Sequence, residues 1–311
     1  MSTKKFLCCL VALVVLVVAG DRVVGTLMRR YYNNVPTGEV HRLQLIEREV
    51  RADVLVMGSS RALHHYVPGM IEQATGLSCY NCGLEAENII THYALMRAIE
   101  QRYEPRVILY EVAHHYDLEN CDYTLRLSKL RRMSSLRCRD SILTDIDPWE
   151  RLRMSSWIYP YNSTLLEMMM ERKVASTYDA PDADNGYVPL HGVMDSTRFV
   201  WNNENVKPCA GIDPVRARYL KDFIARNRSR LVVLVSPRYH ATEATDTLYD
   251  LAREMCRRHG VPFVSARSDT AFTRHVELWD DGGHMNDDGA RLFTRTHVLP
   301  ALEALLKSRK Q

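Results

Sequence analysis

Hydrophobic and polar positions along the chain fall into three patterns. The first is an apolar run near the start, from Phe6 to Ala19, which follows two lysines and ends at Asp21 and Arg22. A basic start before an apolar core is typical of an export signal. The run is shorter than the roughly 18 apolar residues that argue for a full membrane span.

Two interpretations of this segment stay open. Small residues at Ala19 and Gly20 offer a cleavage point for a signal peptide, whereas Val23, Val24 and Leu27 prolong the apolar character as a retained anchor would. We favour the anchor. The sequence therefore predicts a signal anchor or signal peptide over residues 1–28 and a juxtamembrane linker over 29–50. The rest of the chain is expected to be extracytoplasmic, in the periplasm or at the cell surface, and secreted if the signal is cleaved.

The second pattern is an alternation of short apolar strands with helical segments. Strands are predicted at 53–57, 77–81, 106–112, 231–235 and 262–265, and helices at 67–75, 88–102, 243–259 and 287–307. Such alternation predicts a parallel sheet covered by helices on both faces. The sequence thus predicts an α/β domain over 51–113 and 212–307.

The third pattern is the loss of this rhythm between residues 114 and 211. The interval is rich in aromatic residues and Met: Trp149, Trp157, Tyr159, Tyr161, Met168 to Met170, Tyr178, Tyr187 and Trp201. We expect an insertion over 114–211 between the third and fourth strands. It forms either a cap over the substrate or a helical subdomain whose aromatics are its own core, and the pattern is compatible with both.

Composition narrows the function classes only a little. The chain has 311 residues, 41 Lys and Arg against 38 Asp and Glu, and a hydrophobic fraction of 46%, which describes a folded protein without the charge excess of a nucleic-acid binder. Eight cysteines in an exported chain raise the question of disulfides. Cys79 and Cys82 have the spacing of a metal or redox half-site, but no matching second pair follows, so we expect both to be buried at a strand end.

Polar residues with chemical potential follow the predicted strands. Ligands of open parallel sheets bind outside the carboxyl ends of the strands. Gly58-Ser59-Ser60-Arg61 follows the first strand and would present a hydroxyl on a tight turn, and Asn81-Cys82-Gly83 follows the second. Asp281-Gly282-Gly283-His284 precedes the last helix, with a spacing that lets one loop carry an imidazole base and the acid that orients it.

These blocks resemble those of the SGNH (GDSL-type) hydrolase superfamily. The family's first block is Gly-Asp-Ser-Leu after the first strand, and its last is Asp-x-x-His before the final helix; here they read Gly58-Ser59-Ser60-Arg61 and Asp281-Gly282-Gly283-His284. The stretch from His284 to Ala290 is similar to the family's ending, and Gly83 stands at its second block. The resemblance implies a flavodoxin-like three-layer α/β/α fold with a sheet of about five strands, and it leaves the insertion unaccounted for.

The resemblance also implies roles for individual residues. Ser60 would be the nucleophile, His284 its general base and Asp281 the acid that orients the imidazole, with the backbone N–H groups of Ser60 and Gly83 as the oxyanion hole. Asp280 is an alternative partner for His284, and Ser60 is also a residue type that caps helices. Ser59, Arg61 and His114 are candidates for contacting the substrate.

Two departures from the family pattern stand out. The Asn of the third block is missing, because the third strand leads into Glu111-Val112-Ala113-His114-His115. Ser59 replaces the Asp of the first block, which resembles membrane-anchored SGNH-like proteins of cell-envelope polymer acylation. His114 and His115 either supply the missing polar contact or are structural.

Three functions are compatible with these residues. The leading one is an extracytoplasmic serine esterase or O-acyltransferase that acts on an ester-bearing carbohydrate or cell-envelope polymer, without a cofactor or metal. The alternative is a catalytically weak or inactive SGNH-like module that binds glycan or a membrane acyltransferase partner. A third is a metal-dependent hydrolase using Asp280, Asp281, His284 and His114, although no recognised metal-binding spacing supports it. No nucleic acid is expected as a partner, and the membrane is contacted through the N-terminal segment.

Overall fold

One parallel sheet organises the larger part of the chain. The computed structural model describes residues 2–119, 127–162, 184–195, 197, 211–241 and 249–308. Five strands pair in the order β2-β1-β3-β4-β5, and every pairing is parallel. They are β1 (Val54–Gly58), β2 (Cys79–Asn81), β3 (Val107–Glu111), β4 (Leu231–Val235) and β5 (Phe263–Ser265). This is the strand order of flavodoxin-like folds, which confirms the predicted fold class.

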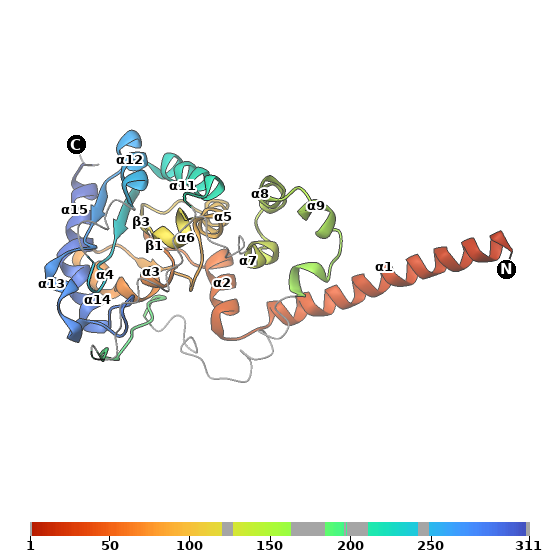
Figure 1. The fold of residues 1–311 in the computed structure, drawn as a ribbon, viewed down its shortest axis with the longest axis horizontal. Helices are drawn as coiled ribbons and strands as arrows, with labels where there is room; N and C mark the ends of the chain where they lie inside the picture. The colour runs from red at the N-terminus through yellow and green to blue at the C-terminus, as the bar shows by residue number, and fades with distance from the viewer. Residues whose placement is uncertain are drawn as a thin grey trace. The chain divides into compact units, whose positions relative to one another are not determined.

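Helices cover both faces of this sheet (Figure 1). On one face lie α5 (Ile89–Glu100), α11 (Pro214–Asn227) and α12 (Asp250–His259). On the other lie α4 (Pro68–Thr75), α14 (Asp287–Phe293) and α15 (Leu299–Ser308). The shorter elements are α3 (Ser60–His65), α6 (His114–Asp117), α13 (Thr270–Thr273) and the 3-10 turn η3 (Val276–Leu278). The result is the three-layer arrangement that the alternating pattern predicts.

The core is built from the two faces of the central strands. Alternate residues of a strand point to opposite faces, and all five residues of β1, β3 and β4 are buried. Val56 and Leu109 belong to the cluster that contains Phe293 of α14. Tyr110, on the opposite face, packs on Phe223 of α11 with ring centroids 4.9 Å apart. Burial on both faces explains why these strands are continuous apolar runs rather than alternating ones.

The last helix differs from its prediction. A single helix was expected over 287–307, but a π-helical turn, η4 (Thr294–Val298), separates α14 from α15. Pro300 has no N–H to donate to the carbonyl four residues earlier, and the N–H of Leu299 donates to the carbonyl of Thr294 instead. Of the helix predicted over 243–259, residues 250–259 are described as α12, and residues 242–248 lie outside the described residues.

The chain divides into two compact units. The first comprises Met1–Leu45 and Leu127–Asp179, and the second comprises Ile46–Arg126 and Ala180–Gln311. The sheet lies entirely in the second unit. The predicted boundaries of the insertion, 114–211, stay a prediction. Of its aromatic and Met residues, Met168 to Met170, Tyr178 and Trp201 lie outside the described residues.

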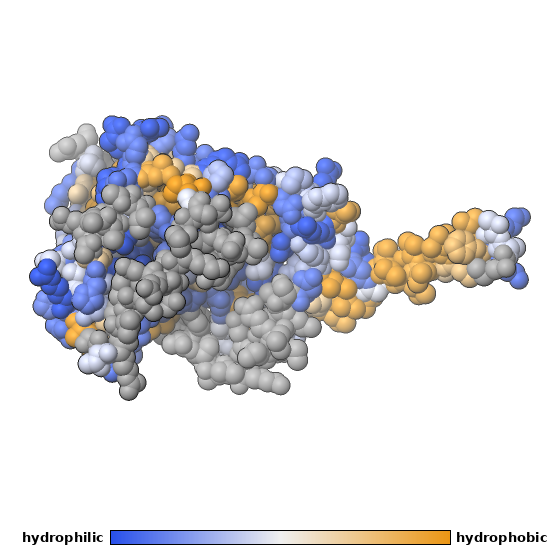
Figure 2. All heavy atoms as spheres, viewed as in Figure 1, coloured by the Kyte–Doolittle hydropathy of each residue, from blue (hydrophilic) through white to orange (hydrophobic). Residues whose placement is uncertain are grey.

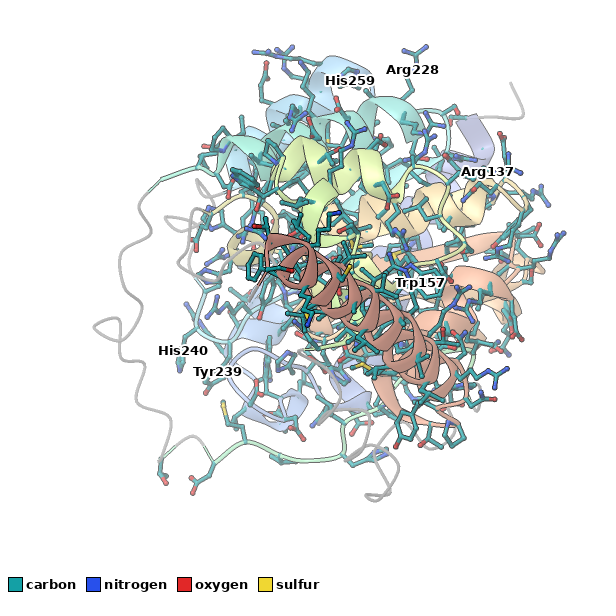
Figure 3. The ribbon with its side chains drawn as sticks, turned by 90° about the vertical axis from the view of Figure 1, so that its right-hand side faces the viewer. Arg137, Trp157, Arg228, Tyr239, His240 and His259 are labelled. Carbon is teal, nitrogen blue, oxygen red and sulfur yellow. The ribbon has the colours of Figure 1, made fainter. Side chains whose placement is uncertain are left out.

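The first unit contains one long helix, α1 (Thr3–Asn33), and several short ones. The short elements are α7 (Ser128–Arg132), α8 (Arg139–Ile146), α9 (Glu150–Arg153) and the 3-10 turn η1 (Tyr159–Tyr161), which contacts α1; most of α2 (Gly38–Arg48) also belongs to this unit. Tyr32 and Tyr161 are buried with ring centroids 5.6 Å apart. Gly25 lets α1 approach the backbone of Trp157, because a Cβ there would lie 2.4 Å from the Trp157 Cβ. Trp157 is labelled in Figure 3. Tyr161 therefore serves the packing of the first unit, whereas Tyr187 packs with Val67 and Ala290 in the second.

The N-terminal half of α1 has no such packing partner among the described residues. Its apolar side chains form the exposed apolar surface seen along the helix in Figure 2. The helix is long and apolar enough to cross a membrane, with a mean hydropathy of 2.5 over its most apolar window. At Asp21 the environment changes, because its carboxylate accepts the backbone N–H of Trp157 at 2.9 Å. An exposed apolar helix at the N-terminus indicates a signal sequence or anchor, and hence export.

Candidate active site

Ser60 stands immediately beyond the carboxyl end of β1. Gly58 closes the strand with φ 140°, a backbone conformation that favours glycine, and a Cβ there would lie 2.6 Å from the Glu111 carbonyl oxygen. Ser59 is the N-cap residue of α3 but makes no capping bond with its side chain, and Ser60 is the first helical residue. The tight turn after β1 therefore brings the Ser60 hydroxyl to the edge of the sheet where parallel strands place their ligand sites.

A short loop before α14 carries the acid and the base. Trp279 and Met285 form an antiparallel bridge that closes the loop, and the buried Trp279 anchors it by donating its indole N–H to the Phe272 carbonyl at 2.9 Å. Within the loop, the Asp281 carboxylate accepts the backbone N–H groups of Gly283 at 2.7 Å and His284 at 2.8 Å. These bonds hold the Asp281 side chain on the same side of the loop as the imidazole.

The three side chains that the sequence singled out meet in one hydrogen-bonded row. His284 Nε2 lies 2.8 Å from Ser60 Oγ, and His284 Nδ1 lies 2.9 Å from Asp281 Oδ2. Because a carboxylate only accepts, Nδ1 carries the proton and Nε2 is left to accept the Ser60 hydroxyl proton. Residues 224 positions apart along the chain thus form the arrangement of hydroxyl, imidazole and carboxylate found in serine hydrolases.

The electrostatics of this row favour an ionised acid. Burial alone would raise the pKa of the Asp281 carboxyl, but the hydrogen bonds from the His284 side chain and from the two backbone N–H groups lower that pKa to about 2. Asp280, the alternative partner, is used elsewhere, since its Oδ1 accepts the N–H of Gly192 at 2.8 Å. The Asp281 carboxylate is therefore the one that contacts the His284 imidazole.

The described end of the insertion lies along this loop. The N–H of Met194 donates to the Trp279 carbonyl at 2.7 Å, and the N–H of Asp287 donates to the Leu190 carbonyl at 2.8 Å. The Asn286 side-chain amide donates to the Gly192 carbonyl at 3.0 Å. Residues 184–195 thus act as a strap that holds the loop against the sheet. Sequence reasoning missed this role because most of the bonds are made by backbone groups.

Two further histidines surround His284, and sequence reasoning missed both. His64 and His65 follow Ser60 by four and five residues on α3, a spacing of about one helical turn, which is the signal that could have found them. Their rings make edge contacts with the His284 ring at centroid distances of 5.6 and 6.2 Å. Burial, followed by the charges of His284 and Arg61, holds the pKa of His65 well below its usual range. His65 is therefore neutral, and its Nε2 accepts the Met285 N–H at 3.0 Å.

The carboxyl end of β3 carries a closed network of buried polar groups. The Glu111 carboxylate accepts the Tyr66 hydroxyl at 2.5 Å and the Ser236 hydroxyl at 2.8 Å, and it pairs with Arg61 at 3.2 Å. Ser236 Oγ in turn lies 2.8 Å from His65 Nδ1. Burial raises the pKa of Glu111 against the opposing effects of Arg61 and these hydrogen bonds. The network ties α3 to β3 and β4 beneath the Ser60 turn.

Arg61 is engaged by protein groups near the carboxyl end of β3. Its guanidinium donates to the Val112 carbonyl at 3.1 Å and to the Tyr249 hydroxyl at 3.3 Å, in addition to the Glu111 pair. Only 11% of the side chain is exposed. The expectation that Arg61 contacts the substrate receives no support from these contacts, which make it a structural ion-pair residue.

Gly83 lies where the resemblance predicts, but its N–H group is already engaged. The Gly83 N–H donates to Asn81 Oδ1 at 2.9 Å, while the Asn81 amide donates to the Ala62 carbonyl at 2.7 Å. A Cβ at Gly83 would lie 2.4 Å from the Leu63 nitrogen, so only glycine allows this approach to α3. The Gly83 N–H can donate to an oxyanion only after its hydrogen bond to Asn81 is broken. The neighbouring Cys79 and Cys82 are buried, as expected, and no disulfide links them.

His114 belongs to a different cluster. It contacts Glu119, as does His115, and the ligand atoms of these three side chains lie within 4.8 Å of one another. They are the group that could hold a metal ion among the described residues. The third functional hypothesis, a metal site shared by His114, Asp281 and His284, is not supported by these contacts, because the last two residues form a row with Ser60.

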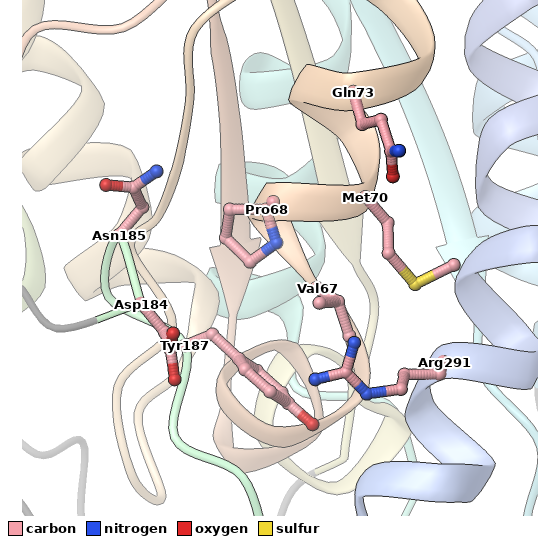
Figure 4. A pocket seen from close by; sticks show the side chains of 9 residues that line it. Val67, Pro68, Met70, Gln73, Asp184, Asn185, Tyr187 and Arg291 are labelled. Atoms are coloured by element: carbon pink, nitrogen blue, oxygen red, sulfur yellow. The ribbon is translucent and has the colours of Figure 1, made fainter.

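A cavity of about 300 Å³ opens between α4 and α14 (Figure 4). Its lining residues are Val67, Pro68, Gly69, Met70, Gln73, Asp184, Asn185, Tyr187 and Arg291, and Ser60 is not one of them. Tyr187 connects the cavity with the loop region, because its hydroxyl donates to Asp287 at 2.8 Å. The candidate site is therefore defined by its side-chain geometry rather than by this hollow.

Comparisons with known proteins leave the family undetermined. No model of a known protein family matches the chain, and no curated protein matches it. The site must accordingly be interpreted from its own geometry.

Proposed function

We propose that this protein is an extracytoplasmic serine esterase or O-acyltransferase of the SGNH type. The single observation that carries the proposal is the row in which Ser60 Oγ lies 2.8 Å from His284 Nε2 and His284 Nδ1 lies 2.9 Å from Asp281 Oδ2. This is the contact that a general base needs to take a proton from an attacking hydroxyl.

The proposed mechanism uses each of the three residues once per half-reaction. Ser60 Oγ attacks the ester carbonyl while His284 takes its proton, and the imidazolium is stabilised by the ionised Asp281. The alcohol leaves with the proton returned by His284, which produces an acyl-serine. Water or a sugar hydroxyl then attacks the acyl group by the same route, giving hydrolysis or acyl transfer respectively.

The oxyanion that forms in these steps needs N–H donors. Ser60 is the first residue of α3, so its N–H has no carbonyl four residues earlier in the same helix to bond with. We propose it as the first donor. Gly83 is the second, after its N–H leaves Asn81. The loss of one such donor costs about 10²- to 10³-fold in rate, so the state of Gly83 sets how active the site is.

The proposed substrate is an ester-bearing glycan or cell-envelope polymer. Support comes from the exposed apolar helix, which fits retention at a membrane outside the cytoplasm, and from the resemblance of the Ser59-Ser60 block to proteins of envelope acylation. We propose that the N-terminal helix is retained as an anchor and that the α/β unit faces the envelope. A membrane acyltransferase is the partner expected if the acyl group is received rather than hydrolysed.

A hydrolysis assay tests the proposal. The full-length protein should hydrolyse p-nitrophenyl acetate with saturation kinetics, and Ser60→Ala should abolish the enzyme-dependent rate. Ser141→Ala is a matched control, since the hydroxyl of this exposed serine donates to the Cys138 carbonyl at the start of α8. Hydrolysis that survives in the folded Ser60→Ala variant would refute the assignment.

The second candidate is an SGNH-like module with little or no activity, which binds glycan or a membrane acyltransferase. The observation that favours it is the engaged Gly83 N–H, together with the missing third-block Asn. Under this hypothesis the wild-type protein shows no turnover, and glycan binding is equal in the wild type and in Ser60→Ala. Turnover that depends on Ser60 would exclude it.

A further inference from the structure

His114, His115 and Glu119 form a second polar cluster beyond the end of β3. Nδ1 of each histidine contacts a different oxygen of the Glu119 carboxylate. The two rings are nearly perpendicular, with centroids 5.9 Å apart and an interplanar angle of 78°. Two imidazole nitrogens and a carboxylate oxygen thus converge within 4.8 Å.

The three residues differ in their access to water. The side chains of His114 and Glu119 are 7% and 5% exposed, whereas His115 is 43% exposed. His114 Nδ1 is buried and lies against the carboxylate, yet it makes no hydrogen bond of acceptable direction. A buried polar atom without a directed hydrogen bond is costly in a protein interior. The hydrogen bonding of this cluster is therefore incomplete at His114 Nδ1.

The backbone that carries the cluster is held firmly. Arg216 donates to the Glu119 carbonyl at 2.8 Å and to the His115 carbonyl at 3.2 Å. Glu119 also forms an antiparallel bridge with Ile212. Because the backbone is already fixed, the three side chains lose less conformational entropy when they bind a ligand.

We propose that His114, His115 and Glu119 bind a divalent transition-metal ion of the zinc type, at a site that shares no residue with Ser60, Asp281 and His284. Two imidazoles and one carboxylate are ligands that zinc takes in proteins, and three protein ligands leave one position open for water or another oxygen ligand. Ligand atoms around a tetrahedral zinc lie roughly 3.3 Å apart. The ligand atoms of the observed cluster already lie within 4.8 Å of one another.

The site is distinct from the Ser60 row but is connected to it through one ring. Tyr249 packs against His114 with ring centroids 5.9 Å apart, and its hydroxyl accepts a hydrogen bond from Arg61, the residue after Ser60. The ion would neutralise Glu119 without replacing any contact of His284. Hydrolysis by the Ser60 row is therefore expected to continue without the ion.

A metal titration tests the proposal directly. The full-length protein, stripped with a chelator, is titrated with ZnCl₂ by calorimetry, and we expect one saturable site per chain. His115→Asn should weaken binding at least tenfold, and Glu119→Gln should do the same. His115 is the more informative variant, because its exposed side chain can be changed with little risk to folding. Titration with Co²⁺ should give the visible absorption of a four-coordinate ion.

Two matched variants locate the ion. His275→Asn removes another histidine that contacts a carboxylate, Glu277 at 3.0 Å, and should leave zinc affinity unchanged. His284→Asn should leave it unchanged as well. The proposal is overturned if the wild type shows no saturable zinc binding, if His115→Asn binds as tightly as the wild type, or if His284→Asn abolishes binding.

Discussion

The carboxyl edge of the sheet carries polar side chains at the ends of both β1 and β3, and the two groups are built in opposite ways. Beyond β1, the side chains of Asp281 and His284 are 58% and 28% exposed, and their hydrogen bonds form an open row that ends at Ser60. At the ends of β3 and β4, Glu111 and Ser236 are fully buried, and the Ser236 hydroxyl donates to the Glu111 carboxylate.

This difference separates reactivity from support. A row that has partly exposed side chains and ends at a hydroxyl can accept a substrate, whereas a buried network whose groups are all engaged can only position its neighbours. The two regions touch through His65, whose imidazole bonds to Ser236 on one side and to the Met285 N–H on the other. Substitutions in the open row should therefore change rates, and substitutions in the closed network should change stability.

The largest expected effect is on catalysis, in His284→Asn. Loss of the imidazole removes the base that the Ser60 hydroxyl contacts, and kcat for p-nitrophenyl acetate should fall by about 10⁴-fold or more. The melting temperature should stay near that of the wild type because the side chain is partly exposed. A folded variant that retains more than a tenth of the activity would show that the open row is not the catalytic region.

Asp281 and Asp280 offer a paired test of the same loop. Asp281→Asn removes the charge that stabilises the imidazolium and should lower kcat by about 10²- to 10⁴-fold. Asp280→Asn keeps the oxygen that accepts the Gly192 N–H, so its activity should stay within about tenfold of the wild type. Steady-state measurements of kcat for the two variants show which of the two carboxylates supports His284. Equal losses would mean that the loop, rather than the contact to His284, is responsible.

In the closed network, Glu111→Gln should act on stability. The change leaves the buried Arg61 without its counter-charge, and breaking a buried pair costs about 3–5 kcal/mol of unfolding free energy. Glu254→Gln is the matched control, since it breaks exposed pairs with Arg257 and Arg258 and should leave the free energy of unfolding close to that of the wild type. Denaturant unfolding followed by near-ultraviolet circular dichroism measures both. A Glu111→Gln variant as stable as the control would show that the network is dispensable.

A pH dependence of stability is expected at Asp117. Its carboxylate accepts the Tyr110 hydroxyl at 3.0 Å and the Ala113 N–H at 2.8 Å, and burial raises its pKa to about 7. Because the folded pKa lies above the unfolded value, the contribution of Asp117 to stability is complete below about pH 4 and is lost as the pH rises to 7. The slope is at most about 1.4 kcal/mol per pH unit.

Asp117→Asn provides the reference for that measurement. The variant cannot ionise at this position, so unfolding free energies measured from pH 4 to 8 should fall less steeply in Asp117→Asn than in the wild type. Parallel pH profiles would mean that Asp117 does not titrate between the folded and unfolded states in this range.

Much of the fold could be predicted because buried parallel strands leave a local signal. The run Leu231–Val235 is apolar at every position, and its predicted bounds equal those of β4. Predicted bounds of the other strands differ from the observed ones by one or two residues, where strand ends meet turns. The π-helical turn at 294–298 was not predicted, since the helical periodicity continues through it.

The site could be predicted in part for a similar reason. Ser60 and His284 could be identified from their places in the chain. Ser60 stands in a glycine turn after a predicted strand, and His284 stands in a loop before a predicted helix. Their contact could be expected only from the rule that parallel strands share one edge. The burial of Arg61 and the strap at 184–195 depend on tertiary contacts that no local pattern encodes. The engagement of Gly83 by Asn81 is local, since the two residues are two positions apart, but it was not predicted.

The most direct test of the account is the site of covalent labelling by a fluorophosphonate, which reacts with a hydroxyl only when a neighbouring base activates it. The full-length protein is treated with the probe, digested, and mapped by mass spectrometry. We predict a single adduct on the peptide that contains Ser60, absent in Ser60→Ala and strongly reduced in His284→Asn. A folded wild-type protein that takes up no label, or that is labelled at another residue, would contradict the account.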